Sequence, residues 1–191
     1  ELMNYTLTRN VKKLSVGQIV YSAMCYENGT MFDDGTLLRL SETGFRWVCG
    51  DEYAGEWLKE KAKKKNFKVV IKNSTDQINN LSVQGPNSRK ILEKIIFTPP
   101  TQPTISELQW FRFTICRLEE LNGIPLIVSR TGYTGELGYE VWCHPDHAPK
   151  VWDKVMEAGK DKGLIPAGFG ALDLLRIEAG LILYGNEFDG Q

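Results

Sequence analysis

Two adjacent carboxylates, Asp33 and Asp34, lie in the segment Met31-Phe32-Asp33-Asp34-Gly35 between apolar stretches. If strand alternation continues through them, one side chain faces inward, where an acid needs a partner. The alternative is a turn in which both aspartates cap backbone N–H groups. The residues alone leave open which aspartate faces a ligand.

A second segment with chemical potential is the glycine-rich SRTGYTGELGYE at residues 129–140, in which three glycines recur every third residue from Gly132 to Gly138. Tyr133 offers an aromatic face for stacking, and Glu140 offers a carboxylate that can accept two hydrogen bonds from an amidine-like heterocycle edge. The alternative is a long hairpin connection without a ligand. The glycines fit neither the dinucleotide-binding nor the P-loop pattern.

Metal and nucleophile chemistry have little support. Residues 143–147 hold both histidines of the chain, but Pro145 interrupts their spacing and no second cysteine pair completes a tetrahedral site. Neither histidine lies in a recognisable nucleophile setting. The four cysteines are far apart in the sequence and form no CxxC pair, so we expect them to be reduced residues of the core. The sequence therefore predicts no metal site and does not favour a hydrolase.

The overall charge and hydropathy exclude two further classes of partner. A formal net charge of -1 with no extended basic face argues against a nucleic-acid-binding protein. No apolar run approaches the roughly 20 residues that cross a bilayer, and no signal peptide opens the sequence. We therefore expect a cytoplasmic protein without nucleic-acid or membrane partners.

Short strands and helices must position these side chains. Turn signals separate three apolar runs at residues 19–26, 36–40 and 45–49, which predict antiparallel strands. Asp51 can cap a helix at 52–65, with Tyr53, Trp57, Leu58 and Ala62 on one side, and 67–71 reads as a strand.

The second half of the chain repeats this mixture. It predicts strands at 81–84, 111–118, 124–129 and 139–143, a linker at 98–103, and helices at 89–96, 147–159 and 170–178. The expected buried side chains of these helices are Ile91, Leu92, Ile95, Val151, Trp152, Val155, Met156, Leu172, Leu175 and Ala179. The fold class is α+β, with mostly antiparallel sheets and flanking helices.

Four segments, at residues 21–35, 81–88, 129–140 and 168–186, resemble successive signatures of the aminomethyltransferase or glycine cleavage T-protein family. The most specific pair is SRTGYTGELGYE followed by GALDLLRIEAGLILYGNE. The resemblance implies the folate-binding T-protein fold, with tetrahydrofolate as cofactor. It further implies that Asp34 is catalytic, that Tyr21 and Tyr133 pack around folate, and that Glu140 hydrogen-bonds the pterin ring.

Within this family, KKLSVGQIVYSAMCYENG and SVQGPNSRK look similar to the dimethylsulfoniopropionate demethylase branch. Leu172 is a further difference from the amine-processing members of the family, which usually carry an arginine at this position. This implies methyl transfer from a small sulfonium donor to tetrahydrofolate. The alternatives are aminomethyl transfer in the glycine cleavage system, which requires a lipoyl carrier protein, and a non-catalytic folate-binding module.

The resemblance also implies a domain organisation. Residues 1–75 correspond to the first part of the folate-binding core, 76–165 to a second, ferredoxin-like α+β subdomain, and 166–191 to a helix and strand that return to the core. Members of the family are about twice this length. We therefore expect this chain to lack the family's N-terminal stretch and C-terminal β-barrel, and with them part of the folate pocket.

Overall fold

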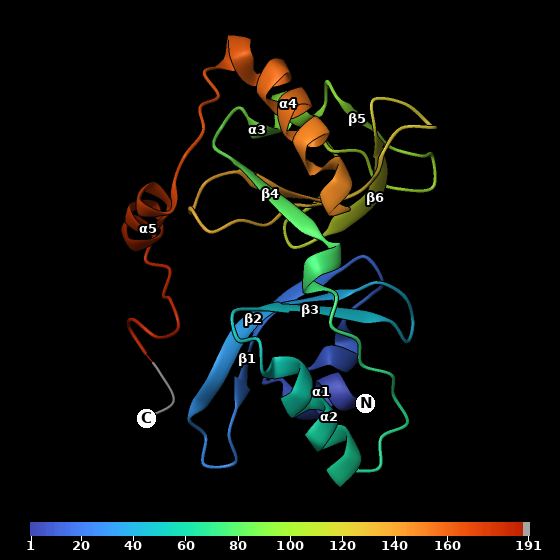
Figure 1. Cartoon of the computed structure of the whole chain (residues 1–191), viewed down its shortest axis with the longest axis vertical. Helices are drawn as coiled ribbons and strands as arrows, with labels where there is room; N and C mark the ends of the chain where they lie inside the picture. The colour runs from blue at the N-terminus through green and yellow to red at the C-terminus, as the bar shows by residue number, and fades with distance from the viewer. Residues whose placement is uncertain (189–191) are drawn as a thin grey trace. The chain divides into compact units, whose positions relative to one another are not determined.

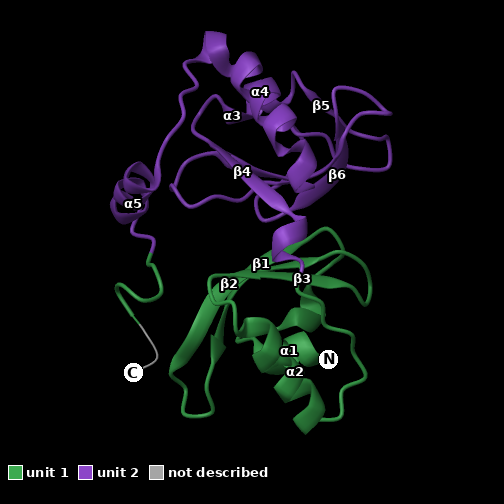
Figure 2. Cartoon of the chain, in the orientation of Figure 1, with its two compact units in different colours: residues 1–73, 182–191 green, residues 74–181 purple. Residues whose placement is uncertain are grey.

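The structure, a computed structural model, describes residues 1–188 of the chain (Figure 1). They form two compact units (Figure 2). Unit 1 comprises Glu1–Asn73 and Ile182–Gln191, of which residues 189–191 are not described, and unit 2 comprises Ser74–Leu181. Each unit has its own antiparallel sheet and its own apolar core. The predicted α+β class with mostly antiparallel sheets is confirmed.

Unit 1 is a three-stranded sheet of order β1-β2-β3, built from β1 (Ile19–Cys25), β2 (Met31–Arg39) and β3 (Phe45–Cys49). The three predicted strands are confirmed, but β2 begins five residues earlier than the apolar run at 36–40 indicated. Asp33 and Asp34 therefore lie inside a strand, and the alternative of a turn is wrong. The pairing with β1 shifts between Met24 and Cys25, which leaves Phe32 as the extra residue of a bulge.

Two helices, α1 (Leu2–Thr6) and α2 (Ala54–Lys64), pack on one face of this sheet, next to a short turn of helix at Val11–Lys13. Helix α2 begins after its N-cap residue Tyr53 and not after Asp51, so the predicted capping role of Asp51 is wrong. The Asp51 side chain instead accepts the N–H of Tyr53 at 2.7 Å in the turn that precedes the helix. Trp57, Leu58 and Ala62 are buried as predicted, but Tyr53 is exposed because it precedes the first helical turn.

The strand predicted at 67–71 is wrong. The segment pairs with no strand among residues 1–188, and Val70 is 97% exposed. Phe67 and Ile71 still pack against the core of unit 1. The apolar alternation thus reflects two anchoring side chains in an extended loop.

Unit 2 is a five-stranded antiparallel sheet of order β4-β8-β7-β6-β5. Its strands are β4 (Asn79–Gln84), β5 (Ile96–Phe97), β6 (Phe113–Leu118), β7 (Pro125–Ser129) and β8 (Gly138–Cys143). Its helices are α3 (Ser88–Leu92), α4 (Ala148–Gly159) and α5 (Phe169–Glu178), with short turns of 3-10 helix at Thr75–Gln77, Pro145–His147 and Lys160–Lys162. The predicted helix at 89–96 ends at Leu92, because Ile96–Phe97 pairs with β6 instead.

The core of unit 2 lies between α3, α4 and one face of its sheet. Ile91, Leu92 and Ile95 are buried as predicted, and so are Val151 and Val155. Trp152, predicted to face inward, is 43% exposed, because the next residue after Val151 is rotated about 100° around the helix. The opposite face of β4 and β8 carries polar side chains, namely Asn80, Ser82, Gln84 and Glu140.

Helix α5 forms as predicted but buries little apolar surface within the described residues. Phe169 is 90% exposed, and Leu175, predicted to be buried, is 40% exposed. The buried residue of this helix is Arg176, which donates to the Asp173 carboxylate at 2.7 Å and to the Leu181 carbonyl at 3.1 Å. In the following segment, the Tyr184 hydroxyl donates to the Met31 carbonyl at 3.4 Å, and residues 189–191 of the predicted returning segment lie outside the described residues.

None of the helices between residues 1 and 188 combines the length and the apolar composition that crossing a membrane requires.

Candidate functional site

The two aspartates of β2 have different surroundings, because successive strand residues face opposite sides of a sheet. Asp33 pairs with Met24 on the face covered by the helices and is 1% exposed. Its two carboxylate oxygens accept the N–H of Asp34 at 2.8 Å and the N–H of Asp51 at 3.0 Å. Asp33 therefore ties β2 to the turn that enters α2, which is a structural role.

Asp34 lies on the opposite face of the same sheet and is half-buried. It is paired with Ala23, so Tyr21 is its diagonal neighbour on β1, and the Tyr21 hydroxyl donates a hydrogen bond to the Asp34 carboxylate. Burial raises the pKa of Asp34, and the nearby charge of Asp33 adds to that rise, although the hydrogen bond from Tyr21 opposes it. A carboxyl group with a raised pKa is typical of a group that exchanges a proton or meets a developing charge.

Glu140 is the corresponding carboxylate of unit 2. It lies on β8 between Ser82 of β4 and Ser129 of β7, on the face opposite α3 and α4. The Asn80 amide donates to one carboxylate oxygen at 2.9 Å, and the Thr131 hydroxyl donates to the other. Glu140 is half-buried. A carboxylate has about four lone-pair directions, so two remain for a ligand.

Behind Glu140 lie three buried polar side chains that the sequence analysis missed. The hydroxyls of Thr131 and Ser129 are 2.7 Å apart, and the Trp142 indole N–H donates to Ser129 at 3.1 Å. One signal for them was available: Trp142 is two residues from Glu140 on β8 and so shares its face.

The glycine-rich loop between β7 and β8 is shaped by Gln84. A Cβ added to Gly132 or Gly138 would lie 2.0 or 1.5 Å from the Gln84 side-chain oxygen. The Gln84 amide nitrogen shares its two hydrogens among three acceptors within 3.1–3.3 Å, which are Ser82 Oγ, the Thr131 carbonyl and the Tyr139 carbonyl. Gly135 instead supplies a backbone φ of +74°, which favours glycine. Two glycines thus make room for Gln84, and the third turns the loop.

Tyr133 is half-buried in this loop. The four predicted site residues therefore fall into two groups: Tyr21 and Asp34 are hydrogen-bonded in unit 1, and Tyr133 and Glu140 belong to unit 2.

The remaining reactive side chains offer little chemistry. Within residues 1–188 no group of three or more His, Cys, Asp or Glu side chains is arranged to hold a metal ion. His144 accepts the N–H of Asp146 at 3.3 Å and so caps a short turn of helix. Burial raises the pKa of the Cys49 and Cys116 thiols to about 12, so neither is a nucleophile at neutral pH.

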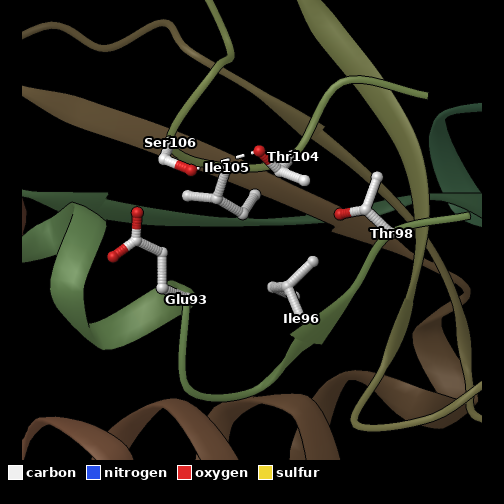
Figure 3. A pocket seen from close by; sticks show the side chains of 6 residues that line it. All are labelled: Glu93, Ile96, Thr98, Thr104, Ile105 and Ser106. Carbon is white, nitrogen blue, oxygen red and sulfur yellow. Dashed lines mark hydrogen bonds between the residues drawn. The ribbon is translucent and has the colours of Figure 1, made fainter. Parts of the chain in front are cut away.

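A pocket of about 240 Å³ opens in unit 2 beside α3 and β5. Figure 3 shows its lining side chains, which are Glu93, Ile96, Thr98, Thr104, Ile105 and Ser106. None of the four predicted site residues is among them, so this pocket is separate from both groups.

Comparisons with known proteins identify the family of the chain. Residues 1–191 match the family model of the GCVT N-terminal domain. The chain is 54% identical over 190 residues to trimethylamine-oxide aldolase from Ruegeria pomeroyi, covering 100% of this chain and 24% of that protein. It is 40% identical over 192 residues to an aminomethyltransferase from Halothermothrix orenii, covering 99% of this chain and 51% of that protein.

A solved structure gives the same picture. The crystal structure of glycine cleavage system aminomethyltransferase T from Bartonella henselae matches with a TM-score of 0.78 at 26% identity, over 100% of this chain and 48% of that one. The chain thus spans about half the length of these aminomethyltransferases and about a quarter of the aldolase. The chain belongs to the glycine cleavage T-protein family, as its signature segments predicted, through the GCVT N-terminal domain.

Proposed function

We propose that this chain is the folate-binding part of an enzyme that transfers a one-carbon unit from a small-molecule donor to tetrahydrofolate. One observation carries the proposal: each sheet bears a half-buried, hydrogen-bonded carboxylate, Asp34 or Glu140, on the face opposite its packed helices. Family membership adds support, because these carboxylates lie in the segments that resemble the T-protein signatures. Bound tetrahydrofolate would supply the nitrogen that accepts the carbon.

Glu140 is the residue that we assign to the pterin ring. Its carboxylate is held by Asn80 and Thr131 and retains acceptor capacity, which suits the amino-pyrimidine edge of a pterin with its neighbouring N–H donors. Tyr133, in the adjacent glycine-rich loop, supplies an aromatic surface for the flat ring.

Asp34 is the residue that we assign to the reacting nitrogen. A partly desolvated carboxylate stabilises positive charge more strongly than one in bulk water, and it can accept the proton that the nitrogen loses. Tyr21 fixes the orientation of this carboxylate through its hydroxyl. Because the hydrogen bond favours the ionised form, Tyr21 also keeps Asp34 available as an acceptor.

The donor is a nitrogen-linked one-carbon unit in our preferred assignment, because the relatives named aminomethyltransferase and trimethylamine-oxide aldolase both act on carbon bound to nitrogen. If the unit is an aminomethyl group, a lipoyl carrier protein is the partner. Methyl transfer from a sulfonium donor is the second candidate, favoured by the segments that look similar to dimethylsulfoniopropionate demethylase. That reaction releases a neutral sulfide and one proton for each methyl group moved.

Product analysis of the full-length protein tests the proposal. It is incubated with tetrahydrofolate and, separately, trimethylamine oxide, an aminomethyl-loaded lipoyl carrier or dimethylsulfoniopropionate, and the folates are identified by mass spectrometry. A nitrogen-linked donor at the aldehyde level should give 5,10-methylenetetrahydrofolate, and a sulfonium donor 5-methyltetrahydrofolate. Asp34→Asn should lose turnover, whereas Asp146→Asn, whose side chain is 82% exposed in unit 2, should keep it. Folate binding without any product would favour the non-catalytic module instead.

A further inference from the structure

Four side chains form a continuous hydrogen-bonded row on the polar face of the unit 2 sheet. The row runs from Trp142 on β8 to Ser129 on β7 at 3.1 Å, then to Thr131 at 2.7 Å, and ends at the carboxylate of Glu140. Ser129 and Glu140 are direct cross-strand partners. The three residues behind Glu140 are buried, so water does not compete strongly for these bonds.

The direction of every hydrogen in this row follows from the groups involved. An indole N–H only donates, so Ser129 accepts from Trp142. An ionised carboxylate only accepts, so the single hydroxyl hydrogen of Thr131 goes to Glu140. Ser129 must then donate to Thr131. All the donors point one way, toward the carboxylate.

The reverse direction leaves the row unsatisfied. If Glu140 carried a proton and donated it to Thr131, then Thr131 would donate to Ser129. Ser129 would then accept from both Thr131 and Trp142, and its own hydrogen would have no acceptor within the row. A buried hydroxyl without an acceptor is costly, so the indole at the far end favours the acceptor-only carboxylate.

We propose that Trp142, Ser129 and Thr131 form a positioning relay that fixes Glu140 as an acceptor-only carboxylate with a single orientation. Asn80 occupies one lone-pair direction of one Glu140 oxygen, and the relay occupies one of the other oxygen. Each of the two oxygens therefore keeps one lone-pair direction for a ligand. Glu140 then selects a heterocycle that presents two adjacent N–H donors, and it rejects an analogue in which the exocyclic amino group is missing. The inference rests on the proposed function, because it assigns the ligand of Glu140 to the pterin class.

Binding measurements on the full-length protein test the relay with two probes, tetrahydrofolate and its 2-desamino analogue. Thr131→Val removes the hydroxyl and keeps the shape of the side chain. We expect it to weaken tetrahydrofolate binding by about ten- to hundredfold, which is the contribution of one hydrogen bond to a charged group, and to reduce the preference over the analogue. Thr131→Ser should restore both, and Trp142→Phe should reduce the preference by a smaller factor.

Thr114→Val is the matched control. Thr114 is also a fully buried threonine of unit 2, and its hydroxyl donates to the Pro103 carbonyl at 2.8 Å, away from Glu140. The Thr114→Val variant should lose stability, as Thr131→Val should, but it should keep the wild-type preference for tetrahydrofolate over the 2-desamino analogue. An equal loss of preference in both valine variants would overturn the relay, since the effect would then be one of general stability.

Glu140→Gln separates failure of the relay from failure of the proposed function. If Glu140→Gln abolishes the preference and Thr131→Val leaves it intact, the relay is wrong and the assignment of Glu140 stands. If Glu140→Gln binds both probes as the wild type does, the assignment of Glu140 to the pterin is wrong, and the relay has no function to serve. Loss of preference in both variants, with rescue in Thr131→Ser, supports the relay.

Discussion

Replacing Asp33 with asparagine separates the structural aspartate of β2 from its neighbour. Both carboxylate oxygens of Asp33 are engaged by backbone N–H donors, from Asp34 at 2.8 Å and from Asp51 at 3.0 Å. Asparagine offers one acceptor oxygen, and its NH₂ group would face the other donor. The substitution therefore removes the buried charge and leaves one backbone N–H without an acceptor.

The size of the effect follows from these two bonds. A hydrogen bond to a charged group contributes about 1.5–3 kcal/mol, and a buried donor left without a partner costs about 1–3 kcal/mol. Because Asp33 is 1% exposed, water has little access to replace the lost bond. We expect Asp33→Asn to lower the free energy of unfolding by about 2–4 kcal/mol.

A urea titration of the full-length protein, followed by tryptophan fluorescence, measures this difference. The matched control is Asp34→Asn, which changes the adjacent residue on the opposite face of β2. Burial disfavours the charge of Asp34, so its removal should leave the stability at neutral pH equal to that of the wild type or higher. The reasoning is refuted if Asp33→Asn unfolds at the same urea concentration as the wild type, or if Asp34→Asn is the less stable of the two.

Three further predictions follow from the same structure. Gly138→Ala should destabilise unit 2 by about 1–3 kcal/mol, because the added Cβ would lie 1.5 Å from the Gln84 side-chain oxygen. Gly55→Ala, where the added Cβ has no atom within 4 Å, should leave the stability unchanged or raise it, and thermal denaturation measures both variants. Because the pKa of Asp34 is raised, the folded state binds the carboxyl proton more tightly than the unfolded state does. The free energy of unfolding of the wild type, relative to that of Asp34→Asn, should therefore fall as the pH rises above the ordinary aspartate pKa of 3.8. Urea titrations at several pH values measure this difference. Tyr21→Phe removes a bond that lowers the pKa of Asp34, so the acid limb of the pH–rate profile should shift to higher pH.

Local patterns in the sequence predicted most strands, because alternation and turn residues act over a few positions. The strands at 45–49 and 139–143 follow from such patterns. Alternation failed at 67–71, where Phe67 and Ile71 bury their side chains without a pairing partner in the described chain. Pairing with a distant strand is a property of the fold that a local pattern does not contain.

The candidate site was only partly accessible to sequence reasoning. Asp33 faces the core by regular alternation with Leu37, but Phe32, at the bulge, is also buried in that core, so alternation counted from Phe32 would assign the two aspartates to the wrong faces. The relay behind Glu140 depends on the register between β7 and β8, which places Ser129 opposite Glu140. The exposed apolar surface of α5 was also unforeseen, because helical spacing predicts which residues share a face and not whether that face is covered.

The most direct test of the central claim is the single-turnover rate of carbon transfer to saturating tetrahydrofolate in full-length Asp34→Asn. The account predicts that this variant still binds tetrahydrofolate, because Glu140 is intact, and that its transfer rate falls by a factor of about 10²–10⁴. A transfer rate equal to that of the wild type at saturation would contradict the assignment of Asp34 to the reacting nitrogen.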